Sequence, residues 1–316
     1  MFKIERTAFG QFTHVHLINS STDEFVSLIP EFGGVINQLV FACRGQNYSI
    51  LNGSANYQEL IANDMFKSSK LVPFPNRIKD GKYVFEGTEY HLPLNFAAEG
   101  HAIHGLVYNK PYEIVNEKSS ETQAVIELAY DYLGDVDGFP FPFRMDMSYI
   151  LSAEHGLVCE TNIANTGKKN MPIGDGWHPY FKTDKKVGRL MLKLPACKRT
   201  LIDDRMIPTG ETEPYSDFNE LRLIGDTKFD TGFQLIGQES VAVTEIYDPE
   251  LDLKISVTQD IGPGKYNFLQ VYIPPPRTSI AIEPMTCNID ALNNKLGLIT
   301  LKPGESFIGR YGVRVD

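Results

Sequence analysis

The stretch Leu251–Thr258, which reads LDLKISVT, alternates apolar and polar residues along its whole length. Its apolar members are Leu251, Leu253, Ile255 and Val257, and a charged or hydroxyl-bearing residue follows each of them. Successive side chains of a β-strand point to opposite faces of the sheet. A period of two therefore predicts a strand with one buried face and one face toward water.

The same alternation recurs along most of the chain. Lys82–Leu92 predicts a hairpin that turns at Glu86, and Met147–Ile163 predicts two strands joined by a turn. Further strands are expected over Val241–Tyr247 and Gly309–Val315. Turn signals such as Asn-Gly, Asp-Gly and Pro-Gly separate these runs at intervals that suit antiparallel strands. The pattern predicts an all-β protein built as a large antiparallel β-sandwich.

Helical signal is sparse. Ala55–Asn63 predicts one short helix, and Phe218–Leu223 and Ile289–Asn294 are each expected to form a single turn. Strands and helices do not alternate, which argues against a parallel α/β layout. Ile273–Arg277, which reads IPPPR, cannot be a central strand because proline donates no ladder hydrogen bond, so we predict a rigid loop. No linker-like tract divides the chain, and residues 1–316 are expected to form one domain.

Composition excludes several classes of partner. The chain has 316 residues and a formal net charge of −10, without a lysine- or arginine-rich run, so nucleic acid and anionic membrane surfaces are poor partners. No apolar run approaches the length of a membrane span, and the start lacks the apolar core of a signal peptide. The four cysteines form no C-x-x-C pair and are expected to be reduced, buried thiols. These features predict a cytoplasmic protein.

The stretch Gly174–Phe181, GDGWHPYF, is the richest candidate for chemistry. It holds Trp177, the only tryptophan, directly before His178, whose imidazole can donate or accept a proton near neutral pH. Trp177, Tyr180 and Phe181 could form an apolar platform for the C–H face of a sugar ring. The alternative is a packed β-corner whose histidine satisfies a buried hydrogen bond.

Two further stretches carry polar side chains that could contact a ligand. In PFPNRI, Pro75 disfavours helix for the residue before it, so Asn76 and Arg77 are expected on an extended segment or loop. An arginine there could hold vicinal hydroxyls or a carboxylate, or could form an ordinary ion pair. In GHAIHG, His101 and His104 lack the third ligand that a metal site needs, so we predict no metal and a possible ligand contact for His104.

Two carboxylates lie among apolar neighbours. Asp230, in FDTGF, could form an Asx turn before Gly232 or accept hydrogen bonds from sugar hydroxyls. Glu283 is expected at the end of a strand, against Pro284. Burial there would raise its pKa and make it a better base near pH 7, whereas the alternative is a glutamate at the rim that faces water.

Taken in order, these stretches resemble the aldose 1-epimerase (galactose mutarotase) family. The resemblance rests on PFPNRI, on His104-Gly105, on GWHPYF, and on the segments around Asp230 and Glu283, and it covers essentially the whole chain. The motif EPMT, which begins at Glu283, resembles the corresponding motif of the bacterial aldose-epimerase-related branch. SLIPEFGGVINQLV at 27–40 and RYGVRV at 310–315 are similar to the family's opening and closing strands.

The resemblance implies a fold and a set of roles. The fold is a galactose mutarotase-like supersandwich with a carbohydrate site on a concave sheet face. Glu283 matches the family's general base and His178, protonated, its general acid. His104 and Asp230 match ligands of the ring oxygen and hydroxyls, Arg77 lines the site with Asn76, and Trp177 is expected beside the sugar.

The reaction so implied interconverts the α and β anomers of a free hexose by ring opening. A base takes the proton from O1 while an acid protonates the ring oxygen, which requires no metal, nucleotide or other cofactor. The expected partner is a small-molecule sugar, and the protein is expected to be a monomer or homodimer. Two alternatives stay open: a carbohydrate-binding or sensing protein without turnover, and a hexose-6-phosphate epimerase. A two-carboxylate glycosidase is disfavoured because the acid position is a histidine.

Overall fold

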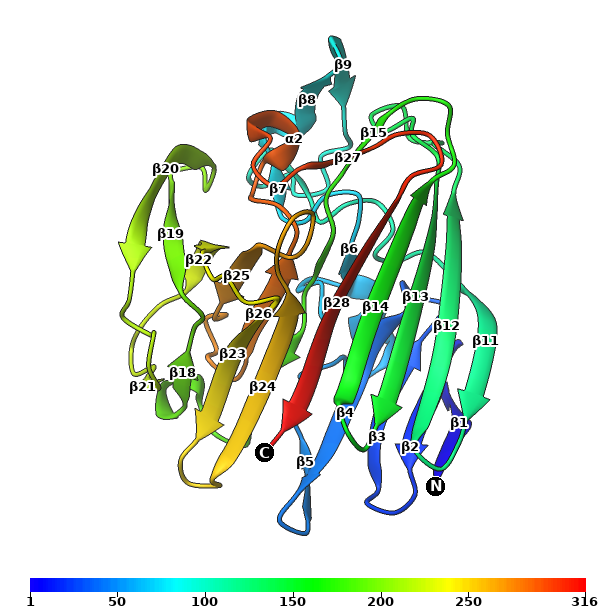
Figure 1. Cartoon of the computed structure of the whole chain (residues 1–316), viewed down its shortest axis with the longest axis vertical. Coiled ribbons are helices and arrows are strands. Elements are labelled where there is room, and N and C mark those ends of the chain that lie inside the picture. The colour runs from blue at the N-terminus through cyan, green and yellow to red at the C-terminus, as the bar shows by residue number, and fades with distance from the viewer.

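The computed structural model describes all 316 residues, and a nine-stranded antiparallel sheet forms its largest layer (Figure 1). In spatial order its strands are β11 (Glu113–Ser119), β12 (Gln123–Tyr132), β13 (Phe143–Ser152), β14 (Gly156–Asn165), β28 (Ser306–Val315), β24 (Leu253–Asp260), β23 (Val241–Asp248), β18 (Met191–Lys193) and β21 (Arg222–Leu223). β28, the last strand in the sequence, lies between β14 and β24 and pairs with both.

A second antiparallel sheet carries most of the residues of interest. Its order is β20 (Pro208–Tyr215), β19 (Cys197–Ile202), β22 (Asp230–Leu235), β25 (Phe268–Tyr272), β26 (Ile280–Met285), β16 (Gly176–Trp177) and β6 (Lys70–Leu71). A further short strand, β17 (Tyr180–Phe181), also pairs with β26. Three two-stranded ladders complete the pairings: β7 (Arg77–Ile78) with β10 (Ala102–Ile103), β8 (Lys82–Phe85) with β9 (Thr88–His91), and β15 (Met171–Ile173) with β27 (Ile299–Leu301).

The N-terminal strands form a third sheet that covers one face of the largest one. They run as a meander through β1 (Phe2–Phe9), β2 (Phe12–Asn19), β3 (Glu24–Ile29), β4 (Val35–Cys43) and β5 (Gln46–Ser49). β2 packs against β12 and β13, and β4 packs against β28. A continuous core of 64 buried hydrophobic residues, reaching from Phe2 to Val313, joins the layers. The all-β sandwich predicted from the alternation is confirmed.

Most predicted elements are present, and two expectations are wrong. The strand predicted over Leu251–Thr258 forms two residues later, as β24, in which Leu253, Ile255 and Val257 are buried, while Leu251 and Asp252 lie in the turn before it. Phe218–Leu223 forms no helical turn, because Phe218 lies in a non-helical turn and the segment ends in β21. Glu283 lies inside β26 rather than at its end, since Pro284 still pairs with Leu269 across the ladder.

The two short helices flank loops that matter for the site. α1 (Tyr57–Ala62) begins after Asn56, whose side-chain oxygen accepts the backbone N–H of Glu59, and it ends at the left-handed residue Asn63. The chain then continues over the pocket described below. α2 (Ala291–Asn294) follows β26 within the predicted segment. Neither helix is long and apolar enough to cross a membrane.

The predicted burial of the cysteines is right for three of the four. Cys159, Cys197 and Cys287 are buried, Cys43 is half-buried, and all four are free thiols.

Candidate active site

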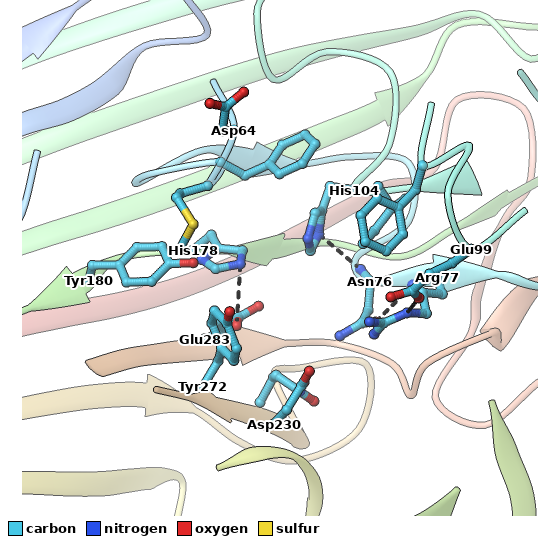
Figure 2. Close-up of a pocket in the computed structure, with 15 residues that line it drawn as sticks. Asp64, Asn76, Arg77, Glu99, His104, His178, Tyr180, Asp230, Tyr272 and Glu283 are labelled. Carbon is cyan, nitrogen blue, oxygen red and sulfur yellow. Dashed lines mark hydrogen bonds and ion pairs between the residues drawn. The ribbon is translucent and has the colours of Figure 1, made fainter. Parts of the chain in front are cut away.

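A cavity of about 200 Å³ opens over the second sheet, where 15 residues line it (Figure 2). Six of the seven residues singled out from the sequence lie in this lining: Asn76, Arg77, His104, His178, Asp230 and Glu283. The structure therefore brings together side chains that span more than 200 positions of the sequence. Their roles toward a ligand are predictions, and their geometry follows.

The floor of the pocket comes from three neighbouring strands. Gln270 on β25 lies directly opposite Glu283 on β26, and Tyr272 lies opposite Asp230 on β22. Gln270 and Tyr272 are two residues apart, so they project from the same face of the sheet as their partners. Four polar side chains thus converge on one surface of the sheet.

His178 lies at an interruption in the strand that neighbours Glu283. β16 pairs with β26 through Gly176 and Met285, and β17 resumes the pairing through Tyr180 and Ala281. This register places His178 across from Glu283 without a ladder bond between them. The His178 Nε2 atom lies 3.4 Å from Oε1 of Glu283, and Figure 2 shows the two side chains facing each other.

The backbone of His178 is held by another segment instead. Its N–H donates to the carbonyl of Ser69 at 3.1 Å, and its carbonyl accepts from the N–H of Ser68 at 2.9 Å. The imidazole stacks on the ring of Tyr180 with centroids 4.9 Å apart. These contacts fix the imidazole toward the pocket, while Pro179, which follows, cannot donate to a ladder.

Burial sets the protonation of this pair. It lowers the pKa of His178 to about 3, so the imidazole is neutral near pH 7. Burial, and next the nearby carboxylate of Asp230, raise the pKa of Glu283 well above its usual value. At 1% exposure the Glu283 carboxyl keeps its proton more strongly than a glutamate in water. The contact between the two groups is therefore not an ordinary ion pair, and burial opposes the protonated His178 expected from the sequence.

His104 presents a donor of defined position. Its Nδ1 accepts the backbone N–H of Asn76 at 3.3 Å, which leaves the proton of the neutral ring on Nε2. Burial, with the adjacent His178 and Arg77, lowers the pKa of His104 well below its usual value. His104 is thus a neutral Nε2–H donor. His101 is buried elsewhere, accepts the N–H of Asp80, and does not line the pocket.

Arg77 is held by two hydrogen bonds that use only some of its N–H donors. Its Nε donates to Glu99 at 2.9 Å and one terminal nitrogen donates to the side-chain oxygen of Asn76 at 3.1 Å. A guanidinium has five N–H groups, so most of its donors stay available to a ligand. Asn76 has a left-handed backbone with φ of 57°, which turns the chain sharply before Arg77 enters β7. The predicted extended segment is thus β7 preceded by a tight bend.

Asp230 is the first residue of β22 and forms no Asx turn, so that alternative is wrong. Its carboxylate accepts a hydrogen bond from Gln270 Nε2 at 2.7 Å. Burial raises the pKa of Asp230, and the positive charge of Arg77 partly opposes that rise. Gly232, two residues on, leaves room for the Gln270 side chain, because a Cβ there would lie 3.2 Å from Gln270 Oε1.

Trp177 does not line the pocket, contrary to the expectation that it contacts a sugar. Its indole is 1% exposed and packs into the core against Tyr149 and Tyr311. Neighbouring strand positions point to opposite faces, so the residue before His178 must face away from the site. Phe181 is likewise buried, and only Tyr180 of the expected aromatic platform reaches the pocket.

Behind Trp177 lies a fully buried ion pair. Lys70 Nζ lies 2.5 Å from Oδ1 of Asp175 and donates to Thr161 on β14 at 2.7 Å. Asp175 also accepts from the hydroxyl of Tyr266 at 2.6 Å. Burial lowers the pKa of Lys70 to about 8 and raises that of Asp175. The pair joins the strands that hold His178 to the nine-stranded sheet.

Three polar atoms at the pocket have no partner within the protein. They are Nδ1 of His178, Oε2 of Glu283 and Oε1 of Gln270. Buried polar groups are normally hydrogen-bonded, and leaving one unpaired costs about 1–3 kcal/mol. Their concentration around His178 and Glu283 indicates a site built to be completed by a polar ligand.

Several lining residues were missed in the sequence. Gln270 is a polar residue inside the apolar run Phe268–Tyr272, the same signal that singled out Glu283, and Tyr272 ends that run. The loop residues Asp64, Met65 and Phe66 line the rim, but nothing in their sequence marks them. No group of three or more His, Cys, Asp or Glu side chains is arranged to hold a metal ion.

Comparison with known proteins agrees with this fold. Residues 16–314 match the family described as aldose 1-epimerase. The Escherichia coli protein YihR, described as uncharacterized, is 31% identical over 253 residues, which cover 77% of this chain and 78% of that protein. A probable aldose 1-epimerase of Arthroderma benhamiae is 26% identical over 63% of this chain and 50% of its own length.

Solved structures share the fold over the full length. A galactose mutarotase-like protein from Clostridium acetobutylicum superposes with a TM-score of 0.86 at 22% identity, covering 100% of this chain and 98% of its own. Galactose 1-epimerase from Lactobacillus acidophilus gives a TM-score of 0.81 at 15% identity, with the same coverage of 100% and 98%. The resemblance read from the sequence motifs is confirmed by the match of nearly the whole chain, and the protein belongs to the aldose 1-epimerase family.

Proposed function

We propose that the protein is an aldose 1-epimerase that interconverts the anomers of a free hexose by acid/base-catalysed ring opening. The observation that carries this proposal is the buried Glu283–His178 pair, 3.4 Å apart, at the floor of a pocket with unpaired polar atoms. A probable aldose 1-epimerase and a galactose 1-epimerase among the similar proteins support the same reaction class.

The reaction needs one proton removed and one delivered. Glu283, as carboxylate, takes the proton from O1 of the sugar, and the O1 electrons form the carbonyl at C1. The C1–O5 bond breaks and O5 takes a proton from His178. Rotation about the C1–C2 bond presents the other face of the carbonyl, and reversal of both transfers closes the ring as the other anomer. Each positioned acid or base contributes roughly 10²–10⁴-fold.

The shifted pKa values of Glu283 and His178 determine which of the two groups carries the transferred proton before the sugar binds. Burial raises the pKa of Glu283 and lowers that of His178, so it favours the arrangement in which the transferred proton lies on the carboxyl rather than on the imidazole. Hydrogen bonds donated by sugar hydroxyls to the carboxylate favour its ionised form, which moves the proton to His178. The neutral Glu283–neutral His178 arrangement and the carboxylate–imidazolium arrangement contain the same number of protons, so a pH profile reports the pair as a unit.

The surrounding side chains position the sugar for this transfer. Nε2–H of His104 and the free N–H groups of Arg77 donate to ring or hydroxyl oxygens, and Asp230 accepts from hydroxyls. Fixed orientation converts binding energy into rate, because the reacting atoms are held near their transition-state positions. We further place the enzyme in the cytoplasm, where its four free cysteines would stay reduced.

The test is catalysed anomer exchange, followed by NMR or polarimetry, over a panel of free and 6-phosphorylated aldoses. The matched control is Glu283→Gln, which keeps the shape of the side chain and removes its basicity. Turnover of a free aldose by the wild type and its loss in the variant supports the proposal. Preference for the phosphorylated series points to a hexose-6-phosphate epimerase, and binding without turnover to a carbohydrate-binding protein.

A further inference from the structure

The loop between α1 and β6 crosses the rim of the catalytic pocket in an unusual backbone conformation. Asn63, Phe66 and Ser68 have positive φ angles of 51°, 49° and 53°. Such angles are uncommon for any residue with a Cβ and are outliers for a bulky one such as phenylalanine. Of the three, only Phe66 lines the pocket. Backbone strain of this kind collects at functional sites, which makes Phe66 the residue to explain.

Neighbouring groups hold the strained backbone of Phe66 in place. Its N–H donates to the carbonyl of Asn63 at 3.2 Å, and its carbonyl accepts the N–H of Ser69 at 3.0 Å. The next residue, Lys67, donates from Nζ to the Glu59 carboxylate of α1 at 2.6 Å. A strained residue persists only where its surroundings fix it in this way. The loop therefore directs the side chain of Phe66 along one line.

That line leads to the imidazole of His104. The rings of Phe66 and His104 are tilted by 57° with centroids 4.7 Å apart, and Tyr108 meets the Phe66 ring edge-on at 5.0 Å. His104 also meets His178 edge-on, with centroids 5.0 Å apart. Aromatic rings attract each other in tilted and edge-on arrangements. The imidazole of His104 is thus packed against both Phe66 and His178.

Hydrogen bonding by itself holds the His104 ring weakly. The ring makes one hydrogen bond within the protein, in which Nδ1 accepts the backbone N–H of Asn76 at 3.3 Å. That distance exceeds the range of about 2.7–3.2 Å that is usual for an N–H donor. A ring with one long hydrogen bond can rock about it, so packing must set the direction of the Nε2–H bond. This N–H is the donor that the proposed reaction uses.

We propose that Phe66 is a positioning residue, which the strained loop presses against His104 so that the Nε2–H donor points at the bound sugar. The observation behind it is the meeting of a left-handed phenylalanine with an imidazole that hydrogen bonds leave underdetermined. The inference rests on the proposed function for the role of His104 toward a sugar. A direct apolar contact between Phe66 and the sugar is a different role, because it would not depend on His104.

A double-mutant cycle between Phe66 and His104 tests whether one acts through the other. Phe66→Leu removes the ring and keeps an apolar side chain, and His104→Ala removes the donor. Phe66→Leu should lower kcat/KM for the best aldose roughly 10–10²-fold, the cost of a displaced group. In the His104→Ala background the same change should alter kcat/KM by less than about twofold, which is the scatter between independent sites. Losses that multiply in the double variant overturn the proposal.

Two matched variants separate the ring from the loop that carries it. Phe66→Tyr keeps the ring and should retain most of the activity. Asn63→Gly relieves the left-handed strain three residues earlier, at a position outside the pocket lining, and should leave the activity unchanged. If either variant is as impaired as Phe66→Leu, disturbance of the loop rather than loss of the ring explains the effect, and the proposal fails.

A spectroscopic measurement on the protein without sugar keeps this inference separate from the proposed function. The ¹⁵N shifts of the imidazole nitrogens distinguish the two neutral tautomers of histidine. Wild type and Phe66→Tyr should show His104 as the Nε2–H tautomer alone, and Phe66→Leu should show a mixture, because a ring free to rock loses its bond from Asn76. An unchanged tautomer in Phe66→Leu refutes the positioning role and leaves the epimerase proposal untouched. Absence of turnover on every aldose refutes the epimerase and leaves the spectrum as the test of Phe66.

Discussion

Replacing Glu283 by glutamine should impair catalysis and stabilise the fold at the same time. The loss of rate follows from removing the base while keeping the volume of the side chain and its position opposite Gln270. A single general base contributes roughly 10²–10⁴-fold, which corresponds to about 2.7–5.5 kcal/mol of transition-state stabilisation. The assay is catalysed anomer exchange across pH 5–9, with the buffer rate subtracted.

The gain in stability follows from the raised pKa of the same carboxyl. Because the folded protein keeps the Glu283 proton to higher pH than the unfolded chain does, the wild type loses stability as pH rises from the unfolded pKa to the folded pKa. Each unit by which folding raises a pKa corresponds to about 1.4 kcal/mol. Glutamine does not titrate, so the advantage of the variant should grow with pH over that window and then stay constant.

Urea denaturation of both proteins at a series of pH values measures this advantage directly. A variant that retains kcat within tenfold of wild type on the best substrate means that Glu283 is not the base. A stability difference that does not increase with pH means that the carboxyl is not held protonated by burial. Either result refutes the corresponding half of the reasoning, and the two halves fail independently.

Three other changes test neighbouring parts of the site. His178→Asn should lower kcat by roughly 10²–10⁴-fold. Burial lowers the pKa of His178 from 6.5 to about 3, so urea denaturation should show the wild type losing stability relative to the variant as pH falls below 6.5. Asp230→Asn should raise KM with kcat within about threefold, since an amide still accepts from Gln270 but binds hydroxyls more weakly; a large loss of kcat at unchanged KM would contradict a binding role. Lys70→Met should lower the free energy of unfolding, measured by urea denaturation, by about 3–5 kcal/mol, because it leaves Asp175 buried without its cation. Adding Asp175→Asn should restore most of that free energy. A double variant as unstable as the single one would show that the pairing is not the cause.

The fold could be predicted from local patterns because burial in an antiparallel sheet leaves a period of two in the sequence. The β8–β9 hairpin lies where the alternation predicts it, and β24 begins two residues after the predicted start. The failure at Phe218–Leu223 has a physical reason: six residues are too few for the spacing of apolar positions to separate a helical turn from a strand end. There, pairing of β21 with β18 decides the conformation.

The site was predictable where a polar residue interrupts an apolar strand and less so where tertiary packing decides. Glu283 was found through its apolar surroundings, and Gln270 carries the same signal. Trp177 was misplaced because its neighbour His178 faces the pocket and adjacent strand residues face opposite ways. The pKa of His178 depends on burial by segments distant in sequence, so the composition of its own stretch could not reveal it.

The central place of β28 bears on how the chain is made. β14 ends at Asn165 and its partner β28 begins only at Ser306, so a chain growing from its N-terminus carries an open β14 edge for about 140 residues. Closing a loop of that length costs roughly 4 kcal/mol in its length-dependent entropy alone. One edge of β24 likewise stays unpaired until β28 is made, and unpaired strand edges are sites of aggregation. The two halves of the largest sheet therefore join in a late, nonlocal step of synthesis, when nascent chains depend most on protection of their exposed edges.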